Sequence, residues 1–511
     1  MRYAAAVAII DERARRLPLL LGAAGAALAL AAWWWYSAQG VILSHYDTKG
    51  HLVVARRVFD SLTPGWKQIG AVWLPLPHLL NMLPVQVDSL YRTGFSATLI
   101  SVTGLALASA SAARLTLRAT GSVAAACTGA ALLALNPNLL YLGATPMTEP
   151  LLLGLVLLAV ADTYRWVQDG RERLPLRLGL ALAAAAWTRY EAWPVIAALA
   201  GLAGAAWWRQ GRQARWILDR LVALAAWPAI AALVFLLNSY ITVGSWFVSS
   251  GFFVPDPVML HRPAHDLASI LWGARALGGS VLVVTGLSAA AWIAVRGVRS
   301  PADAPALVAL APLAATALPA LAFFQGHPFR VRYMVPLVAA LALTAALGTG
   351  WLGRLRRGWA WAPAAVVLAA VCLQTPPFSG EAAMVREAQW DRPASVARQQ
   401  VTRCLAPAYR GELVLASMGS LAHYMQELSA EGFALADFIN EGNGVIWELA
   451  LERGAAPLAG WMLVEEHSEG GDVLAQRIRT DPAFAAGMTA ICEGGGVTLY
   501  RRGTAPALAR R

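Results

Sequence analysis

Residues 44–78, directly after the first long apolar run, gather an unusual amount of ionisable chemistry for so apolar a chain. They include two aspartates, both lysines of the chain and three of its eight histidines. Asp47 lies between the end of the apolar run and the next helical pattern, where two interpretations compete. It either caps the N-terminus of a helix, or acts as a base that removes a proton from a hydroxyl group.

Two other carboxylates lie directly before apolar runs. Glu149 lies in TPMTEP, where the dipole of the following helix would by itself favour a negative charge. An acid at membrane depth is costly, however, and therefore also indicates a functional site with a cationic partner. Glu191 lies with Arg189 in TRYEAWP, and these two side chains either pair with each other or belong to such a site.

A pair of arginines precedes a late apolar run in the segment QGHPFRVRYMVP. Arg330 and Arg332 are separated by one residue and followed by Tyr333, while His327 lies just upstream. Guanidinium groups bind phosphate through paired hydrogen bonds. The segment therefore predicts a phosphate site, and the alternative is that the arginines are ordinary flanking charges of a membrane span.

The composition places most of the chain in a lipid bilayer. Its 511 residues are 58% hydrophobic and only 14% charged, with a mean hydropathy of +0.52, whereas soluble domains carry about 25% charged residues. The net charge of +11 would suggest nucleic acid in a soluble protein. Here the arginines lie mostly in short connections between apolar runs, as topology signals do, and we therefore exclude nucleic acid as a partner.

Apolar runs of roughly 20 residues predict membrane-spanning helices. The sequence predicts an all-α polytopic bundle of about eleven spans, near residues 17–43, 93–115, 121–141, 148–167, 174–188, 191–208, 217–240, 271–295, 303–324, 332–350 and 358–374. The fifth and sixth are short and joined by TRYEAWP, so they can also form one broken hairpin. No cleavage site follows the first run, which is therefore expected to remain as a span.

Arginines cluster in alternate connections and mark these as cytoplasmic. An odd number of spans then places the N-terminus in the cytoplasm and the C-terminal part outside. All eight histidines, and the acids and arginine pair described above, fall on the outer side in this topology. The chemistry of the protein is therefore expected at the outer membrane surface.

The first outer loop is predicted to hold two juxtamembrane segments. Over residues 49–62, apolar side chains recur at helical spacing, while Lys49, Arg56 and Asp60 gather on the opposite face. This pattern predicts an amphipathic helix in the plane of the membrane interface. Its basic side chains are expected to contact lipid headgroups or the phosphate of a lipid substrate. A second segment with a tryptophan anchor follows in VWLPLPHLLNMLP.

Several motifs of the chain resemble those of bacterial members of the GT-C glycosyltransferase superfamily. They are the acid of the first outer loop, WLPLPH, NPNLLYLGATPMTEPLLL, TRYEAWP and FRVRYMVPL. The resemblance is greatest to protein O-mannosyltransferase-like and aminoarabinose-transferase-like enzymes, and it covers roughly residues 1–372. It implies a multi-span helical bundle in the bacterial inner membrane, juxtamembrane helices in the first outer loop, and a polyprenyl-phosphate-linked sugar donor.

The resemblance also implies residue roles. Asp47 matches the catalytic acid of the first outer loop, and Glu149 matches the acid before the fourth span. The segment associated with the lipid phosphate is matched by Arg330, Arg332 and Tyr333.

This sequence departs from the pattern at one position. Many relatives have two adjacent acids in the first loop, whereas Thr48 follows Asp47 here, so the second acidic role passes to Glu149 or is absent. His51 and His78 are candidates to assist, or to hold a divalent cation with the acids. The further candidates for donor, acceptor or metal contacts are Glu191 and His327. No residue spacing demands a metal, so we expect that no cofactor is required, with a divalent metal as the alternative.

Residues 375–511 are expected to form a second, soluble domain after the transmembrane domain of residues 1–374. ELVLAS, WMLVEE and VTLYRR predict strands, and VIWELALERG predicts a helix closed by Gly454. Together they indicate a small α/β domain on the outer side, where Cys404 and Cys492 can pair if the compartment is oxidising. The domain is expected to cover the active site or bind the acceptor, and plain structural capping is the alternative.

These patterns and the resemblance predict an integral-membrane glycosyltransferase that acts on the outer face of the membrane. It would move a hexosyl or pentosyl group from a polyprenyl-phosphate-linked donor to a protein, lipid or polysaccharide acceptor, in an inverting displacement with Asp47 as general base. The arginines would stabilise the charge that grows on the departing phosphate. The alternatives are a transporter or flippase of a lipid-linked sugar, which should show internal repeats and midplane polar residues, and a lipid-binding scaffold or sensor.

Overall fold

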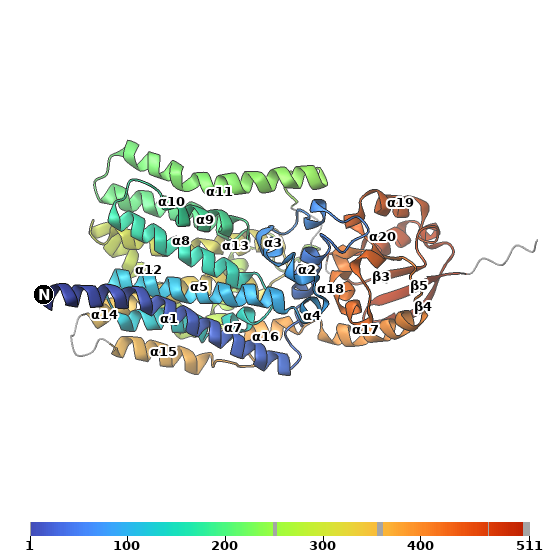
Figure 1. Cartoon of the computed structure of the whole chain (residues 1–511), viewed down its shortest axis with the longest axis horizontal. Helices are drawn as coiled ribbons and strands as arrows, with labels where there is room; N and C mark the ends of the chain where they lie inside the picture. The colour runs from blue at the N-terminus through green and yellow to red at the C-terminus, as the bar shows by residue number, and fades with distance from the viewer. Residues whose placement is uncertain (1, 249–252, 355–360, 469, 504–511) are drawn as a thin grey trace, which may run out of the picture.

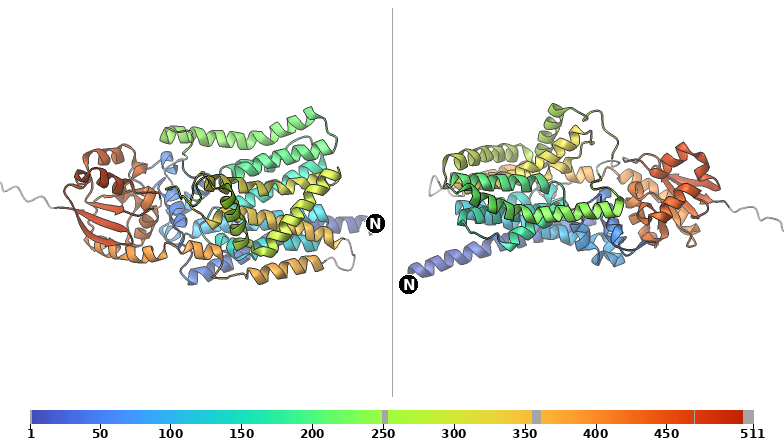
Figure 2. Two further views of the ribbon diagram at one scale, coloured as in Figure 1. Left: turned by 180° about the vertical axis from the view of Figure 1, so that it is seen from behind. Right: turned by 90° about the horizontal axis from the view of Figure 1, so that it is seen from above.

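The computed structural model describes residues 2–248, 253–354, 361–468 and 470–503. The chain forms a long helical bundle with a small α/β domain at one end (Figure 1). The N-terminus lies at the opposite end of the bundle from that domain, and the views from behind and from above agree (Figure 2). An odd number of membrane crossings between the two would produce this arrangement.

Seven helices of the described chain are long and apolar enough to cross a membrane. They are α1 (Arg2–Ala38), α5 (Phe95–Thr120), α8 (Glu149–Asp169), α11 (Ala214–Val243), α12 (Pro263–Arg299), the segment Ala304–Phe324 with α13 (Ala317–Phe324), and the segment Val331–Gly353 with α14 (Val335–Gly353). The other four predicted spans coincide with shorter or bent helices: α6 (Val123–Ala134) and α7 (Pro137–Gly143), which meet at 68°, then α9 (Leu176–Ala186), α10 (Ala192–Arg209) and α15 (Ala362–Gln374). Each predicted span therefore contains helix among the described residues, and the count of eleven remains a prediction.

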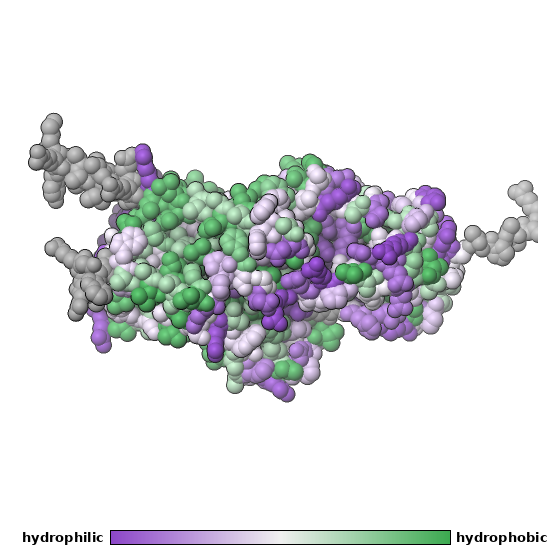
Figure 3. Space-filling model, turned by 90° about the horizontal axis from the view of Figure 1, so that it is seen from below, coloured by the Kyte–Doolittle hydropathy of each residue, from purple (hydrophilic) through white to green (hydrophobic). Residues whose placement is uncertain are grey.

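The outer surface of the bundle has the apolar character that a bilayer requires. Large apolar side chains such as Leu218, Ile230 and Leu233 on α11 and Trp272 and Val284 on α12 are exposed. Hydrophobic surface covers the bundle in Figure 3, while hydrophilic surface gathers over the C-terminal domain and its junction with the bundle. Exposure of such a surface to water is unfavourable, whereas contact with the hydrocarbon core of a bilayer is not.

A break in α12 connects the bundle to the segment that leads into the C-terminal domain. Gly279 adopts a left-handed conformation (φ 77°) inside α12, which interrupts the helical hydrogen-bond pattern. The freed carbonyl of Leu277 accepts hydrogen bonds from the amides of Asn136 and Asn138, at 2.9 and 2.8 Å. Asn138 also accepts from the backbone N–H of Met384, at 2.8 Å. The two asparagines of NPN thus satisfy buried backbone groups on two separate segments.

The first outer loop lies between the bundle and the C-terminal domain (Figure 1). It contains α2 (Tyr46–Arg56), α3 (Leu76–Asn81) and α4 (Asp88–Thr93). The expectation of an amphipathic helix over residues 49–62 in the membrane plane is wrong in two respects. The helix ends at Arg56, and residues 47–55 are all buried, because α18 (Met418–Leu428) of the C-terminal domain packs against α2.

The polar face of α2 is paired with the C-terminal domain rather than exposed to lipid headgroups. Lys49 Nζ lies 2.5 Å from Glu427 Oε1, which also accepts from Ser395 at 2.8 Å and Arg398 at 3.1 Å. Arg398 is fully buried and makes a two-pronged ion pair with Asp391, at 3.1 and 2.7 Å. The predicted contact of Lys49 with lipid phosphate is therefore replaced by an ion pair between the two parts of the chain.

Arg56 is likewise used inside the protein. Its guanidinium pairs with Asp60 at 2.8 Å and with Asp88 at 2.7 Å, and it lies 4.4 Å above the ring of Tyr91. Both carboxylates belong to the first outer loop. The positive charge of Arg56 thus holds this loop together, which is a different role from the predicted substrate contact.

The C-terminal domain is built on a five-stranded sheet of order β2-β1-β3-β5-β4. The predicted strands are confirmed as β1 (Val414–Ala416), β3 (Trp461–Glu465) and β5 (Val497–Arg502), and the predicted helix as α19 (Val445–Arg453); β2 (Phe438–Ile439) and β4 (Met488–Gly494) were not predicted. β1 runs parallel to β2 and β3, and β5 runs antiparallel to β3 and β4. The remaining helices are α16 (Ala383–Ala388), α17 (Arg392–Leu405) and α20 (Val473–Thr480). A disulfide between Cys404 and Cys492 joins α17 to β4.

The ion pairs of Glu427 generate a stability prediction. We expect Glu427→Gln to lower the free energy of unfolding by about 3 kcal/mol, because it leaves the charge of Lys49 buried without its partner. Thermal unfolding of the detergent-solubilised protein measures this loss. Glu431→Gln, at an exposed position of the same domain, is the matched control and should unfold like the wild type.

The same contact predicts a pH dependence. Burial by itself would raise the pKa of Glu427, but Lys49 and Arg398 outweigh it and lower the pKa to about 2. Because this folded-state pKa lies below the ordinary glutamate value of about 4.3, the carboxylate stabilises the fold above that value and loses its contribution as the pH falls toward 2. The difference in stability between wild type and Glu427→Gln should therefore shrink over this range. A difference that is independent of pH would contradict the ion pair.

Candidate active site

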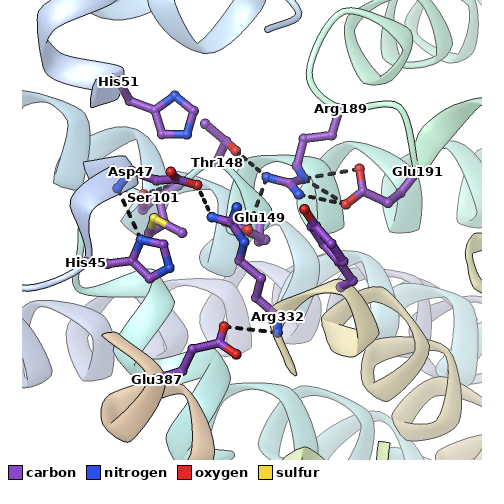
Figure 4. A network of polar contacts seen from close by, with 12 residues as sticks. His45, Asp47, His51, Ser101, Thr148, Glu149, Arg189, Glu191, Arg332 and Glu387 are labelled. Carbon is purple, nitrogen blue, oxygen red and sulfur yellow. Dashed lines mark hydrogen bonds and ion pairs between the residues drawn. The ribbon is translucent and has the colours of Figure 1, made fainter. Parts of the chain in front are cut away.

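Five ionisable residues from four separate segments meet at the end of the bundle that faces the C-terminal domain (Figure 4). Asp47 comes from the first turn of α2, Glu149 from the first residue of α8, Arg189 and Glu191 from the break between α9 and α10, and Arg332 from the turn before α14. Each of them ends or begins a helix at the same face of the bundle. The predicted residues Asp47, Glu149, Arg189, Glu191 and Arg332 are therefore brought together.

Asp47 is 4% exposed, and its Oδ2 forms an ion pair with Nη1 of Arg332. It is not the cap of α2, because that position belongs to His45, whose Nδ1 accepts the backbone N–H of Asp47 at 3.2 Å. Burial alone would raise the pKa of Asp47, but the Arg332 guanidinium outweighs it and holds that pKa below its usual range. The side chain is thus an ionised carboxylate with one strong partner.

Arg332 is positioned by a residue that sequence reasoning missed. Glu387 of α16 accepts the backbone N–H groups of Val331 and Arg332, at 2.6 and 3.4 Å, and so fixes the turn that directs Arg332 toward Asp47 (Figure 4). Burial raises the pKa of Glu387 despite these hydrogen bonds. No local pattern marks this glutamate, because its partners lie more than fifty positions earlier in the chain.

Arg189 joins two acids. Its Nη2 lies 2.7 Å from Oε1 of Glu191 and its Nη1 lies 3.0 Å from Oε1 of Glu149, while Nη1 also donates to Thr148 at 3.0 Å. The pairing of Arg189 with Glu191 is therefore confirmed, and it extends to Glu149. Glu149 is fully buried, and neither of its oxygens accepts a hydrogen bond from the described residues. It is therefore a buried acceptor beside an arginine that donates hydrogen bonds to Glu191 and Thr148.

The predicted histidines of the first loop form a separate pair. His51 Nδ1 lies 3.0 Å from His78 Nε2, and the ring of Trp73 packs against both, with centroids 4.2 and 5.8 Å away. Burial lowers the pKa of His51 to about 3, so the ring is neutral. Within the described ranges, no group of three or more histidine, cysteine, aspartate or glutamate side chains is arranged to hold a metal ion. The divalent cation considered as an alternative therefore stays an untested hypothesis.

Arg330, Arg332 and Tyr333 of the segment FRVRY contact different groups. Arg330 lies 5.6 Å from the ring of Trp390, whereas Arg332 enters the buried cluster. The Tyr333 hydroxyl lies 3.0 Å from Nε2 of His327, whose Nδ1 lies 2.7 Å from the carbonyl of Pro328. Of the three residues predicted to contact a lipid phosphate, Arg332 alone contacts Asp47.

A cavity of about 710 Å³ lies next to this cluster. Its walls include Val331 and Glu387, which border Arg332, together with Trp272 and Phe329 on the apolar side and Asn138 on the polar side. Aromatic walls and a few polar groups are typical of a pocket for an organic ligand. Arg332 and Asp47 do not line this cavity themselves; it reaches the cluster only through Val331 and Glu387.

Comparisons with known proteins support the fold. No family model matches the chain, and no curated protein matches its sequence. Crystal structures of ArnT from Cupriavidus metallidurans are similar in structure. The form bound to undecaprenyl phosphate has a TM-score of 0.56 and the apo form 0.54; both are 12% identical and cover 94% of this chain and 97% of the ArnT chain. The likeness shows that this chain shares the fold of ArnT over nearly its whole length, with the soluble domain included in the match.

The buried pair of Asp47 and Arg332 generates a double-mutant prediction. Asp47→Leu or Arg332→Met alone leaves one charge without its direct partner, and we expect each to lower the free energy of unfolding by about 3–5 kcal/mol. The double variant removes both charges and should lose much less than the sum of the two. Thermal unfolding in detergent provides the measurement. Additive losses would show that the two side chains do not interact.

Proposed function

We propose that this protein is an integral-membrane glycosyltransferase. It transfers a sugar from a polyprenyl-phosphate-linked donor to an acceptor hydroxyl on the outer face of the bacterial inner membrane, with Asp47 as general base. The observation that carries the proposal is the buried ion pair between the carboxylate of Asp47 and the guanidinium of Arg332, at the end of an apolar bundle. The GT-C fold and the binding of undecaprenyl phosphate by the ArnT neighbour support the choice of donor.

Asp47 and Arg332 have separate roles in the proposed reaction. Asp47 accepts the proton of the acceptor hydroxyl as the acceptor oxygen attacks the anomeric carbon of the sugar. The bond from that carbon to the phosphate oxygen breaks, and the polyprenyl phosphate departs with the electron pair. Attack opposite the leaving group inverts the anomeric centre. Arg332 stabilises the negative charge that develops on the departing phosphate.

The pairing of Asp47 with Arg332 fits this sequence of events. Arg332 lowers the pKa of Asp47 and so weakens it as a base. A phosphate group placed against Arg332 would share its positive charge, and the pKa of Asp47 would then rise toward its ordinary value. The base would therefore become competent when the donor is in place. Glu149, with two buried acceptor oxygens, is the proposed contact for hydroxyl groups of the sugar.

The topology of the proposal follows from three observations. Arginines lie in alternate connections of the bundle, as the positive-inside rule requires of cytoplasmic loops. The C-terminal domain lies at the end of the bundle opposite the N-terminus, and its disulfide suits an oxidising compartment. We therefore assign the N-terminus to the cytoplasm and the C-terminal domain to the periplasmic side. No observation specifically favours transport without catalysis.

The role of Asp47 is tested by Asp47→Asn, which keeps an oxygen acceptor for Arg332 and removes the base. We expect the rate of transfer to fall by about 10²–10⁴-fold, measured as release of undecaprenyl phosphate from a polyprenyl-phosphate sugar in the presence of cell-envelope acceptors. Asp162→Asn is the matched control, because Asp162 is also buried and paired with arginines, Arg177 and Arg114. Near-normal transfer by folded Asp47→Asn protein would exclude the proposed base.

The sugar and the acceptor are identified by mass spectrometry of the cell envelope with and without the protein. We expect a lipid, protein or polysaccharide that loses the mass of one glycosyl unit when the protein is absent, and also when only Asp47→Asn is present. Unchanged envelope components, together with no consumption of any polyprenyl-phosphate sugar, would contradict a transferase.

A further inference from the structure

His45 is a buried residue that neither the sequence patterns nor the proposed reaction uses. Its Nδ1 accepts the backbone N–H of Asp47 at 3.2 Å, and this hydrogen bond assigns the ring proton to Nε2. The side chain is 2% exposed, and Nε2 has no hydrogen-bond partner among the described residues. A buried donor without an acceptor destabilises a fold, so its presence two residues from the proposed base calls for an explanation.

A second donor at the same place is also unused. Nε of Arg332 is buried and donates to no group in the part of the chain that the structure describes. Both side chains contact Asp47: His45 accepts its backbone N–H, and Arg332 pairs with its carboxylate. The two side chains with unused donors therefore lie next to the same residue (Figure 4). Two unused donors beside one residue fit a ligand group with several acceptor oxygens.

The charges around His45 narrow the class of ligand. The largest electrostatic effects on it come from Arg332, Asp47, Arg330 and Arg189, while the ring of Tyr46 stacks on it at 5.3 Å. Because one of the two unused donors belongs to the guanidinium of Arg332, an anionic ligand suits the pair. A phosphate group combines negative charge with three or more acceptor oxygens.

We propose that Nε2–H of His45 donates a hydrogen bond to a phosphate oxygen of the polyprenyl-phosphate donor, beside the guanidinium of Arg332. The inference rests on the proposed function and adds a substrate-binding residue to it. His45 thereby joins two roles at one helix end: its Nδ1 positions the first turn that carries the base, and its Nε2 contacts the leaving group.

A neutral donor suits this position better than another cation. Burial, with a further contribution from Arg332, lowers the pKa of His45 to about 3, so the ring stays neutral throughout the physiological range. A further positive charge so close to Asp47 would lower the pKa of that carboxylate still more and weaken it as a base. A neutral N–H group binds the phosphate without this effect.

His45→Asn separates the two roles of the ring. Asparagine is among the best N-cap residues, so it can replace Nδ1 as the acceptor of the Asp47 N–H, but it offers no group at the place of Nε2. We expect its affinity for undecaprenyl phosphate in detergent to fall by about 10-fold or more, as for loss of a hydrogen bond to a charged group. Its thermal unfolding should stay close to that of the wild type.

Three comparisons make the result specific. Undecaprenol, which lacks the phosphate, should bind equally to the wild type and to His45→Asn. Inorganic phosphate should compete with undecaprenyl phosphate only at far higher concentration, whereas equal potency would assign the site to free phosphate and overturn the lipid donor. His423→Asn is the matched control, because His423 is also buried with an unpartnered Nε2, but its electrostatic partners are Arg398, Asp391, Glu427 and Lys49.

The outcomes distinguish this inference from the proposed function. A wild-type protein that does not bind undecaprenyl phosphate would overturn the proposed donor. Wild-type binding with unchanged affinity in His45→Asn would overturn the role of His45 alone. Equal losses for undecaprenyl phosphate and undecaprenol would assign His45 a structural role. The ratio of the affinities of the wild type and His45→Asn for undecaprenyl phosphate should be the same at pH 5 and pH 8. A change in this ratio would contradict a neutral donor.

Discussion

The structure depends on one buried ion pair, between Asp47 and Arg332. Two charges removed from water are stable only when each is matched by a partner in good geometry, and several contacts serve this requirement. His45 holds the first turn of α2, and Glu387 holds the backbone that carries Arg332. The second group, Glu149, Arg189 and Glu191, is arranged around a single guanidinium. A buried acid or arginine without a partner would destabilise the fold. Paired as they are, these side chains form a polar layer at the end of an apolar bundle.

The C-terminal domain completes this layer. α2 carries the proposed base and packs both against α18 of the domain and against the rest of the first outer loop, so the domain contributes to its burial. Lys49 and Glu427 join the two parts two residues from Asp47. Glu387 reaches Arg332 from the segment that leads into the domain. The soluble part is therefore a structural component of the site, which explains why it packs so closely on the first outer loop.

Sequence reasoning identified most of the charged cluster and misjudged its surroundings. Asp47, Glu149, Arg189 and Arg332 could be predicted because ionisable groups are rare in apolar chains and stand out at the ends of spans. Lys49 was interpreted by its local pattern, which describes an isolated amphipathic helix and contains nothing about a domain that follows more than 300 residues later. Glu387 and Glu427 escaped notice for the same reason, since an acid in a soluble helix looks ordinary until its partner is known.

The sequence by itself determined which segments are helical and apolar, and that acids and arginines collect at helix ends on one side, because the bilayer imposes these patterns locally. It also determined three of the five strands of the α/β domain, β1, β3 and β5, through their short apolar runs. Only the tertiary structure decided which arginine meets the base. Arg330 and Arg332 are equivalent in composition, yet one lies against Trp390 and the other pairs with Asp47, 285 positions away. That choice is made by the direction of a single turn, and this direction is fixed by Glu387, a contact between distant segments that no local pattern encodes.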